Sequence, residues 1–231
     1  MNIEEVKISH SPWRNQSILR HLDANELAYL EAASEIRHYN KGEIIFLQGK
    51  YIEGCYLLVS GVIKQFKTGI EGREYIIRLT NPFCLLGFRS ILNDEPACHT
   101  STVLVDSDVC YIPTECLQRL IKTNGNFALE LLQIICRELE ESHSLLTDIA
   151  QKSLRQLMAE LLLMLKNKFG VDRNGNLNIL LSREELANCV GTATESVIRL
   201  LSEFKAEGYI DVSAKKIAII NEKALERVAV L

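Results

Sequence analysis

Two helix-start signals lie ten residues apart in the segment "SREELANCVGTATESVIRLLSEFKAEGYI". Ser182 with Glu185, and Thr192 with Glu195, each place an N-cap hydroxyl three residues before a glutamate, which is the spacing of a capping box. Gly191 lies between the two signals, and glycine readily takes the left-handed conformation that ends a helix. The segment therefore predicts two short helices joined by a tight turn.

The second predicted helix has an apolar stripe and a polar stripe on opposite faces. Spacings of i, i+3, i+4 and i+7 predict a buried stripe of Val197, Leu200, Leu201 and Phe204. The opposite stripe carries Glu195, Ile198, Arg199 and Ser202. In a DNA major groove an arginine can bind guanine, a carboxylate can accept from cytosine N4, and an apolar side chain can contact the thymine methyl. Two hypotheses stay open for this stripe: base reading, or a surface ion pair between Glu195 and Arg199 at i, i+4.

The stretch "GYIDVSAKKIAIIN" predicts two short strands around a turn that carries Lys215 and Lys216. Beside a helix pair, such a hairpin is typical of a wing whose cations contact a phosphate backbone. A solvated loop is the alternative. The net charge of the chain is −4, but residues 146–231 hold 12 Lys and Arg against 11 Asp and Glu, or +1, which leaves −5 for residues 1–145. The C-terminal part is therefore compatible with a polyanionic partner.

The first half of the chain has a different sequence pattern, dominated by short β-prone runs. The run "DANELAYLEAAS" (residues 23–34) predicts a short helix with Asp23 or Asn25 as its cap. Residues 36–112 then alternate glycines with brief β-prone runs such as "EIIFL", "CYLLVSGVIKQF", "EYIIRL", "STVLV" and "VCYI". This pattern predicts a compact antiparallel roll or barrel of short strands.

A heptad-like series predicts a long helix from about Asn126 to Ala150. Its members recur at alternating spacings of 3 and 4: Leu132, Ile135, Leu139, Ser142, Leu146 and Ile149. We expect this narrow stripe to form a dimer seam, and packing of the helix on its own domain is the alternative. A further apolar helix is predicted for residues 151–169, closed by Gly170. The domain boundary therefore falls near Ala150.

The sequence argues against several classes of protein. Seven cysteines form an odd set without a CxxC pair, which favours reduced thiols over a disulfide framework. No HExxH, GxSxG or P-loop spacing occurs, so we expect neither an enzyme nor a metal site. The N-terminus is charged, and no uncharged run approaches the roughly 18 residues of a membrane span. We expect a soluble, cytoplasmic protein without a membrane partner.

The order of these motifs resembles that of the Crp/Fnr family of bacterial transcription regulators over nearly the whole chain. The segments "KGEIIFLQG", "YLLVSGVIKQF", "EGREYIIRLTNPFCLLGF" and "DSDVCYIP" are similar to the family's cyclic-nucleotide-binding-type β-roll. The resemblance implies an α+β chain of three parts: an antiparallel β-roll effector-sensing domain with an N-terminal helix (1–124), a dimerisation helix (125–150), and a winged helix-turn-helix DNA-binding domain (151–231). It also implies a homodimer whose partners are double-stranded DNA and RNA polymerase.

The resemblance also implies which residues contact DNA. Glu195 and Arg199 match the two positions that read a TGA core in family members, which implies a palindromic site with a TGA-like core. Thr194 occupies the place of a further base-reading arginine in the cAMP-responsive branch, so the full TGTGA half-site does not follow. The expected DNA-binding set is completed by Thr192, Ile198, Lys215 and Lys216. The alternative function is a ligand-binding module whose C-terminal helices contact a protein partner.

The candidate effector pocket departs from the family pattern. The family's cAMP cassette uses a glutamate on the ribose and an arginine on the cyclic phosphate, and the matching stretches here are "GFRS" and "ACHT", so Phe88 and Cys98 replace those two residues. A phosphate buried without a guanidinium is poorly compensated, and we do not expect cAMP. Arg89 is expected to point the other way, as a strand neighbour. The pocket candidates are Gly87, Phe88, Arg89, Cys98, His99 and Ser142, the last matching a base-contacting position on the family's dimer helix.

A metal ion, an iron–sulfur centre and haem are further ligand types to consider for this chain. Adjacent strand residues face opposite sides, so Cys98 and His99 are expected to be a packed cysteine beside a surface histidine and not joint metal ligands. The cysteine cluster that holds an iron–sulfur centre in the oxygen-sensing branch has no counterpart, because the first cysteine is Cys55. His143 is a conceivable haem ligand, although we favour a solvated helix residue. The effector stays unidentified, and a small anion, an apolar ligand and haem all remain open.

Overall fold

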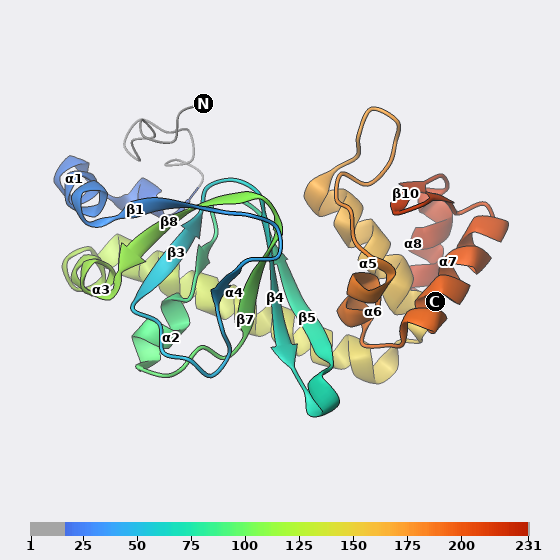
Figure 1. The fold of residues 1–231 in the computed structure, drawn as a ribbon, viewed down its shortest axis with the longest axis horizontal. Helices are drawn as coiled ribbons and strands as arrows, with labels where there is room; N and C mark the ends of the chain where they lie inside the picture. The colour runs from blue at the N-terminus through green and yellow to red at the C-terminus, as the bar shows by residue number, and fades with distance from the viewer. Residues whose placement is uncertain (1–16, 231) are drawn as a thin grey trace. The chain divides into compact units, whose positions relative to one another are not determined.

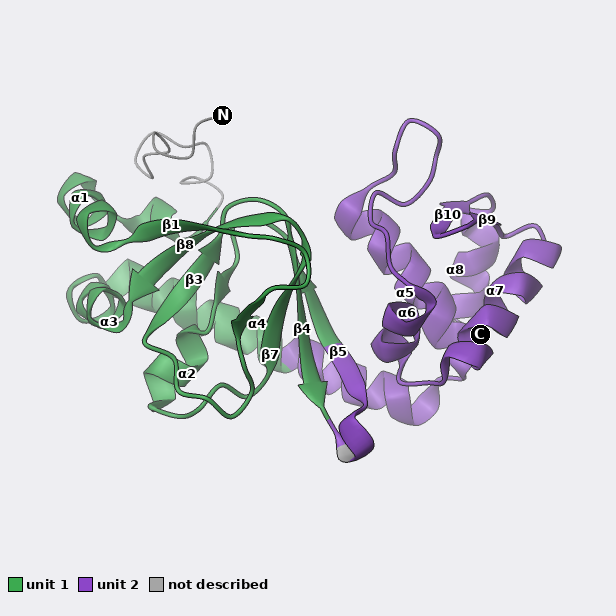
Figure 2. Ribbon diagram, in the orientation of Figure 1, with its two compact units in different colours: residues 1–68, 77–139 green, residues 69–76, 140–231 purple. Residues whose placement is uncertain are grey.

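The computed structural model describes residues 17–230, and the expectations for residues 1–16 lie outside this range. The chain divides into two compact units (Figure 2). Unit 1 comprises residues 1–68 and 77–139, and unit 2 comprises residues 69–76 and 140–231. Unit 1 contains the β-sheets, whereas unit 2 is mostly helical and carries a β-hairpin, which confirms the predicted α+β class.

Two four-stranded sheets form the roll of unit 1 (Figure 1). Their strand orders are β1–β8–β3–β6 and β2–β7–β4–β5, and the recorded pairings are antiparallel. The strands are β1 (Glu35–Tyr39), β2 (Ile44–Phe46), β3 (Gly54–Leu58), β4 (Val62–Thr68), β5 (Glu74–Thr80), β6 (Leu85–Leu86), β7 (Thr100–Val105) and β8 (Ser107–Pro113). The predicted β-prone runs coincide with β2, β3, β4, β5, β7 and β8. The sequence pattern missed β1 and β6, because "EIRHY" has no continuous apolar run and β6 has only two residues.

The first sheet is buried on both faces, because alternate residues of a strand point to opposite sides. One face packs against helices, in a cluster that includes Cys55, Leu57, Cys110, Ile112, Leu117 and Phe127. The other face packs against the second sheet, in a cluster that includes Phe46, Tyr56, Leu58, Ile63, Val103 and Val109. The roll therefore has two apolar layers, one inside it and one under its helices.

The helices of unit 1 are α1 (Ala24–Ala33), α2 (Phe88–Asn93) and α3 (Thr114–Thr123), with a 3₁₀ turn at Ile18–His21; the 3₁₀ turn at Ile70–Gly72 belongs to unit 2. Asp23 is the cap of α1, since its carboxylate accepts hydrogen bonds from the backbone N–H groups of Asn25 and Glu26 at 2.8 Å each. Glu26 accepts from the Asp23 N–H in return, which completes a capping box. The predicted helix at residues 23–34 is confirmed, whereas α2 was not predicted.

Helix α4 (Gly125–Gln151) continues from unit 1 into unit 2 and confirms the predicted long helix. Phe127 and Leu131 bury one side of it in the core of unit 1. The exposed fractions of the heptad leucines and isoleucine are 59% for Leu132, 55% for Leu139, 66% for Leu146 and 48% for Ile149. Ile135 differs from them, because it is half-buried against the same core. Most of the predicted seam is therefore an exposed apolar stripe on α4.

Helix α5 (Leu154–Phe169) starts later than predicted, so the start at Gln151 is wrong. The cause is a capping box that the sequence reading overlooked: Ser153 Oγ accepts from the Gln156 N–H at 3.3 Å, and Gln156 accepts from the Ser153 N–H at 2.8 Å. The predicted end is confirmed, because Gly170 with φ of 73° follows the last helical residue.

The rest of unit 2 is α6 (Arg183–Val190), α7 (Thr194–Ala206), the hairpin β9 (Ile210–Ser213) and β10 (Lys216–Ile219), and α8 (Glu222–Val230). Its core is closed by buried residues of the four helices, including Met158, Leu162, Leu186, Val197, Phe204 and Leu225. The terminal helix α8 was not predicted. Among the described helices, none is long and apolar enough to cross a membrane.

Candidate nucleic-acid interface

The first helix of the predicted pair, α6, forms as the sequence indicated. Ser182 Oγ accepts from the Glu185 N–H at 3.0 Å, and the Glu185 carboxylate accepts from the Ser182 N–H at 2.6 Å. Gly191 ends the helix in the left-handed conformation, with φ of 70° and ψ of 38°. The capping box and the glycine therefore fix both ends of α6.

The second predicted capping box, between Thr192 and Glu195, is wrong. The N-cap of α7 is Ala193, and within the described residues no side chain caps this helix. The backbone N–H of Thr192 donates to the Ala187 carbonyl at 3.1 Å, so Thr192 still belongs to the turn that closes α6. Thr194 and Glu195 consequently lie in the first turn of α7, where the positive end of the helix dipole favours a carboxylate.

Helix α7 divides into a buried face and an exposed face, as predicted. Val197, Leu200, Leu201 and Phe204 are at most 6% exposed. On the opposite side Glu195, Ile198, Arg199 and Ser202 are exposed, and the Arg199 side chain keeps 74% of its surface in solvent. The buried face anchors α7 in unit 2, and the exposed face is free to enter a groove.

The surface ion pair considered for Arg199 involves a different partner. Arg199 Nε lies 3.8 Å from Glu203 Oε1, one helical turn towards the C-terminus, and not beside Glu195. Glu203 also lies 3.4 Å from Arg155 of α5. An exposed pair at this distance contributes about 0–1 kcal/mol, which is too little to hold Arg199 away from another acceptor.

The hairpin after α7 presents the two predicted lysines. Strands β9 and β10 pair antiparallel, Ala214 takes a positive φ of 53° in the turn, and Lys215 and Lys216 are exposed. Arg183 of α6 donates to the Ala214 carbonyl at 2.9 Å and so anchors the turn to the helix pair. The sequence reading did not single out Arg183, although its place directly after the Ser182 cap puts it at the start of α6.

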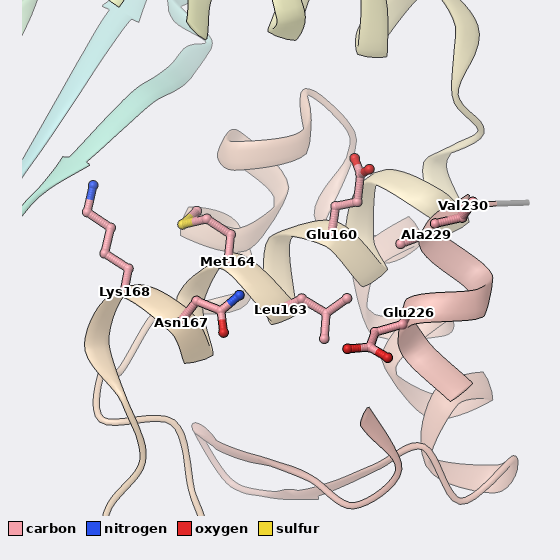
Figure 3. A pocket seen from close by; sticks show the side chains of 8 residues that line it. All are labelled: Glu160, Leu163, Met164, Asn167, Lys168, Glu226, Ala229 and Val230. Atoms are coloured by element: carbon pink, nitrogen blue, oxygen red, sulfur yellow. The ribbon is translucent and has the colours of Figure 1, made fainter. Parts of the chain in front are cut away.

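A second surface of unit 2 is a groove of mixed charge between α5 and α8, with a volume of about 610 Å³. Leu163 and Met164 lie along α5, and Val230 lies near the end of α8 (Figure 3). Its charged lining residues are Glu160, Glu226 and Lys168, and Glu160 also forms an ion pair with Lys152. Two carboxylates against one lysine in the lining make this groove a poorer match for a phosphate backbone than the basic hairpin. The basic hairpin and the exposed face of α7 are the better candidates.

In unit 1, the first effector segment is a helix start and not a strand. Gly87 is the N-cap of α2 with φ of 79°, and Phe88 is only 2% exposed within the helix-covered core. The expectation that Arg89 points away as a strand neighbour is therefore wrong. Its side chain is 53% exposed, and its Nη1 lies 3.9 Å from an oxygen of Glu138, to which Arg78 also donates a hydrogen bond.

The expectation of a surface histidine beside a packed cysteine is also wrong. Cys98 and His99 lie in a bend before β7, which brings Cys98 Sγ within 3.3 Å of His99 Nδ1. His99 is only 9% exposed, and its Nε2 has no hydrogen-bond partner among residues 17–230. Burial, followed by the positive charges of Arg89, Arg78 and Lys67, lowers the pKa of His99 to about 4, so the imidazole is neutral at pH 7.

The remaining effector candidate, Ser142, is exposed on α4. His143, considered as a haem ligand, is exposed on the same helix, in agreement with a solvated residue. Within the described part of the chain, no group of three or more His, Cys, Asp or Glu side chains is arranged to hold a metal ion.

A helix pair followed by a basic hairpin, with an exposed arginine on the second helix, defines a winged helix-turn-helix domain. Family models match both halves of the chain: a cyclic nucleotide-binding domain at residues 36–124 and a Crp-like helix-turn-helix domain at residues 156–228. The chain belongs to the Crp/Fnr family and is a DNA-binding transcription regulator of that type.

Individual relatives are similar to this protein over most of the chain. The CRP-like cAMP-activated global transcriptional regulator of Mycobacterium tuberculosis is 24% identical over 212 residues, which cover 91% of this chain and 95% of the relative. Transcriptional activator protein FnrA of Stutzerimonas stutzeri is 27% identical, over 82% of this chain and 78% of its own. The crystal structure of a putative Crp/Fnr regulator from Eubacterium rectale has a TM-score of 0.78 at 24% identity, over 96% of this chain and all of that chain. FixK2 from Bradyrhizobium japonicum has a TM-score of 0.75 at 20% identity, over 84% of this chain and 96% of its own.

Proposed function

We propose that this regulator acts in the cytoplasm as a homodimer that binds a pseudo-palindromic DNA site with a TGA-like core, under the control of an effector other than cAMP. The observation that carries the proposal is the separation of faces on α7: one stripe is buried in unit 2, and Arg199 on the opposite stripe is 74% exposed. The protein regulates by binding and not by catalysis, with RNA polymerase as its further partner.

Each exposed residue of α7 has a chemical role in the proposed complex. Arg199 donates to guanine, Glu195 accepts from the cytosine amino group, and Ile198 contacts the thymine methyl. Thr192 lies in the turn before α7 and Thr194 in the first turn of that helix, where hydroxyl and backbone N–H groups suit a phosphate or a base edge. Lys215 and Lys216 bind the flanking phosphates without reading sequence.

The proposed dimer uses the exposed stripe of α4. Leu132, Leu139 and Leu146 recur every seven residues, and each is more than half exposed, so a second copy of the helix would remove them from water. Ile135 contributes less than predicted, because it already packs in unit 1. Two-fold symmetry then places the two recognition helices in successive major grooves, which sets half-sites about one helical turn, roughly 34 Å, apart.

The proposed effector differs from cAMP in its chemistry. Phe88 fills the core at the position of the ribose-binding glutamate, and Cys98 offers no positive charge at the position of the phosphate-binding arginine. Arg78 and Arg89 are both near Glu138, which already balances part of their charge. We expect a calorimetric titration with cAMP to show no binding in the micromolar range, and a micromolar affinity would contradict this part of the proposal.

Salt dependence tests DNA binding against the alternative of a protein partner on the same face. Phosphate contacts release counterions, so the logarithm of DNA affinity should fall linearly with the logarithm of salt concentration. Fluorescence anisotropy of a labelled duplex, measured at increasing salt, gives the slope directly. A flat profile would leave the exposed face of α7 as a protein-binding surface.

A further inference from the structure

The roll of unit 1 contains an open cavity that is separate from both effector segments. Its volume is about 530 Å³, and its lining comes from β1, β2, β3, β8 and the loop between β2 and β3. Pockets of about 300–1,000 Å³ are typical of small-molecule sites. The residues that decide its chemistry are Arg37, Phe46, Lys50, Tyr51, Tyr56 and Tyr111, and we refer to it as the tyrosine cavity.

Three aromatic rings form one wall of the tyrosine cavity. Tyr56 and Tyr111 are direct cross-strand partners on β3 and β8, with ring centroids 5.4 Å apart. Phe46 of β2 stacks on Tyr56 at 5.8 Å. Gly54 is required beneath this wall, because a Cβ there would lie 2.5 Å from Tyr111 Cε2. The wall is therefore a preformed aromatic surface, in which the ring planes are tilted by 29° between Phe46 and Tyr56 and by 55° between Tyr56 and Tyr111.

The lining of the cavity contains two cations, Arg37 and Lys50, and one carboxylate, Glu53. The Arg37 guanidinium lies 3.9 Å from the centroid of the Tyr111 ring, and it also donates to Glu35 at 2.9 Å. Lys50 forms hydrogen bonds only through its backbone within the described residues, and its side chain is exposed. Glu53 is the carboxylate among the lining residues. Since Glu35 already balances Arg37, Lys50 is the cation left to meet a ligand anion.

The mouth of the tyrosine cavity is unusually apolar for a surface in water. Tyr51 is 70% exposed, Ile44 is 50% exposed and Leu47 is 44% exposed. Clustered apolar side chains of this kind mark binding surfaces more often than isolated ones do. Burial raises the pKa of Tyr56 to about 12, so its hydroxyl stays neutral and does not repel an anion.

The tyrosine cavity adjoins the effector segments without containing them. Ile52 in its lining lies so close to Gly87 that a Cβ added there would be 2.7 Å from Ile52 Cδ1. On its far side, the Phe46 ring lies 5.5 Å from the His99 ring. None of the residues Gly87–Ser90 or Ala97–Thr100 is among the lining residues of the cavity.

We propose that the tyrosine cavity binds a small planar aromatic carboxylate, with the ring against Tyr111 and Tyr56 and the carboxylate on Lys50. The rings supply the aromatic apolar contact, Lys50 supplies the charge, and Tyr51, Ile44 and Leu47 close over the exposed edge of the ligand. This site is independent of the proposed DNA contacts, since every lining residue belongs to unit 1.

Isothermal titration of the full chain with naphthoate and its neutral analogue naphthamide tests the proposal. Lys50→Gln should weaken naphthoate binding about fivefold or more, a loss near 1 kcal/mol, and should leave naphthamide affinity unchanged. Tyr111→Leu should weaken both compounds. The matched control is Tyr29→Leu, because Tyr29 also carries an arginine over its ring, Arg119 at 4.1 Å, but lies outside the cavity lining.

The controls show whether a loss of binding comes from the cavity contacts or from an unspecific change in the protein. Tyr29→Leu should bind both compounds as the wild type does, and melting curves should show Lys50→Gln folded like the wild type. The proposal is overturned if naphthoate fails to bind the wild-type chain below about 1 mM. It is equally overturned if naphthamide binds as tightly as naphthoate, or if Tyr29→Leu weakens binding as much as Tyr111→Leu.

Discussion

Replacing Arg199 with alanine separates base reading from every other role of this side chain. In the folded protein, Arg199 is 74% exposed and its recorded ion pair with Glu203 spans 3.8 Å. Such a pair contributes about 0–1 kcal/mol, so the free energy of unfolding should change by no more than about 1 kcal/mol in Arg199→Ala. A change in DNA affinity then reports on DNA contacts and not on folding.

The expected loss of affinity follows from the proposed guanine contact. A bidentate base contact is worth about 1–3 kcal/mol. Since 1.4 kcal/mol corresponds to a factor of ten, Arg199→Ala should weaken binding about tenfold or more per half-site on the cognate duplex. On a scrambled duplex of equal length and composition, affinity and its salt dependence should stay close to the wild-type values.

Fluorescence anisotropy on the two duplexes measures both quantities, and Glu203→Gln is the matched control. That variant removes the ion pair of Arg199 while keeping the arginine, so its affinity should stay within about twofold of the wild type. An equal loss on cognate and scrambled DNA would make Arg199 a phosphate contact. If Glu203→Gln reproduces the loss, the ion pair matters and the base-reading assignment is wrong.

Four further predictions follow from the same structure. Lys216→Ala should lower affinity equally for cognate and scrambled duplexes and reduce the salt slope by about one per half-site, measured by anisotropy. Leu139→Asp should give a monomer in sedimentation velocity where the wild type is a dimer, and a persisting dimer would put the seam elsewhere. The folded-state pKa of His99, about 4, lies below its ordinary 6.5, so the free energy of unfolding should fall as pH decreases between these values, and His99→Leu should flatten that part of the profile. Ser182→Ala should cost about 1 kcal/mol of stability in urea unfolding, whereas Thr192→Ala should cost no more than a few tenths.

The two predicted capping boxes show what a local sequence pattern can and cannot predict. Ser182 and Glu185 predicted the start of α6 correctly, because both partners of the box lie within one turn. Thr192 and Glu195 have the same spacing, yet the N–H of Thr192 bonds to Ala187 and places it in the preceding turn. Spacing alone does not tell whether a residue ends one helix or begins the next.

The environment of His99 lay beyond sequence reasoning because it depends on distant segments. Phe46 comes from β2, Arg78 from β5 and Arg89 from α2, and only the folded roll brings them near the imidazole. The tyrosine cavity is similar, since the pairing register of β3 with β8 places Tyr56 beside Tyr111. Most of the longer helices and strands, and the two faces of α7, were predictable from the sequence. Sites assembled from several strands were not.

Selection of bound duplexes from a random DNA pool tests the central claim most directly. If α7 reads bases in a symmetric dimer, the enriched sequences should contain two inverted TGA-like half-sites about one helical turn, roughly 10 base pairs, apart. The same selection with Arg199→Ala should lose preference at the guanine of each half-site while the spacing is retained. Enrichment of a single asymmetric motif, or no enrichment at all, would contradict the account of a dimeric, sequence-reading regulator.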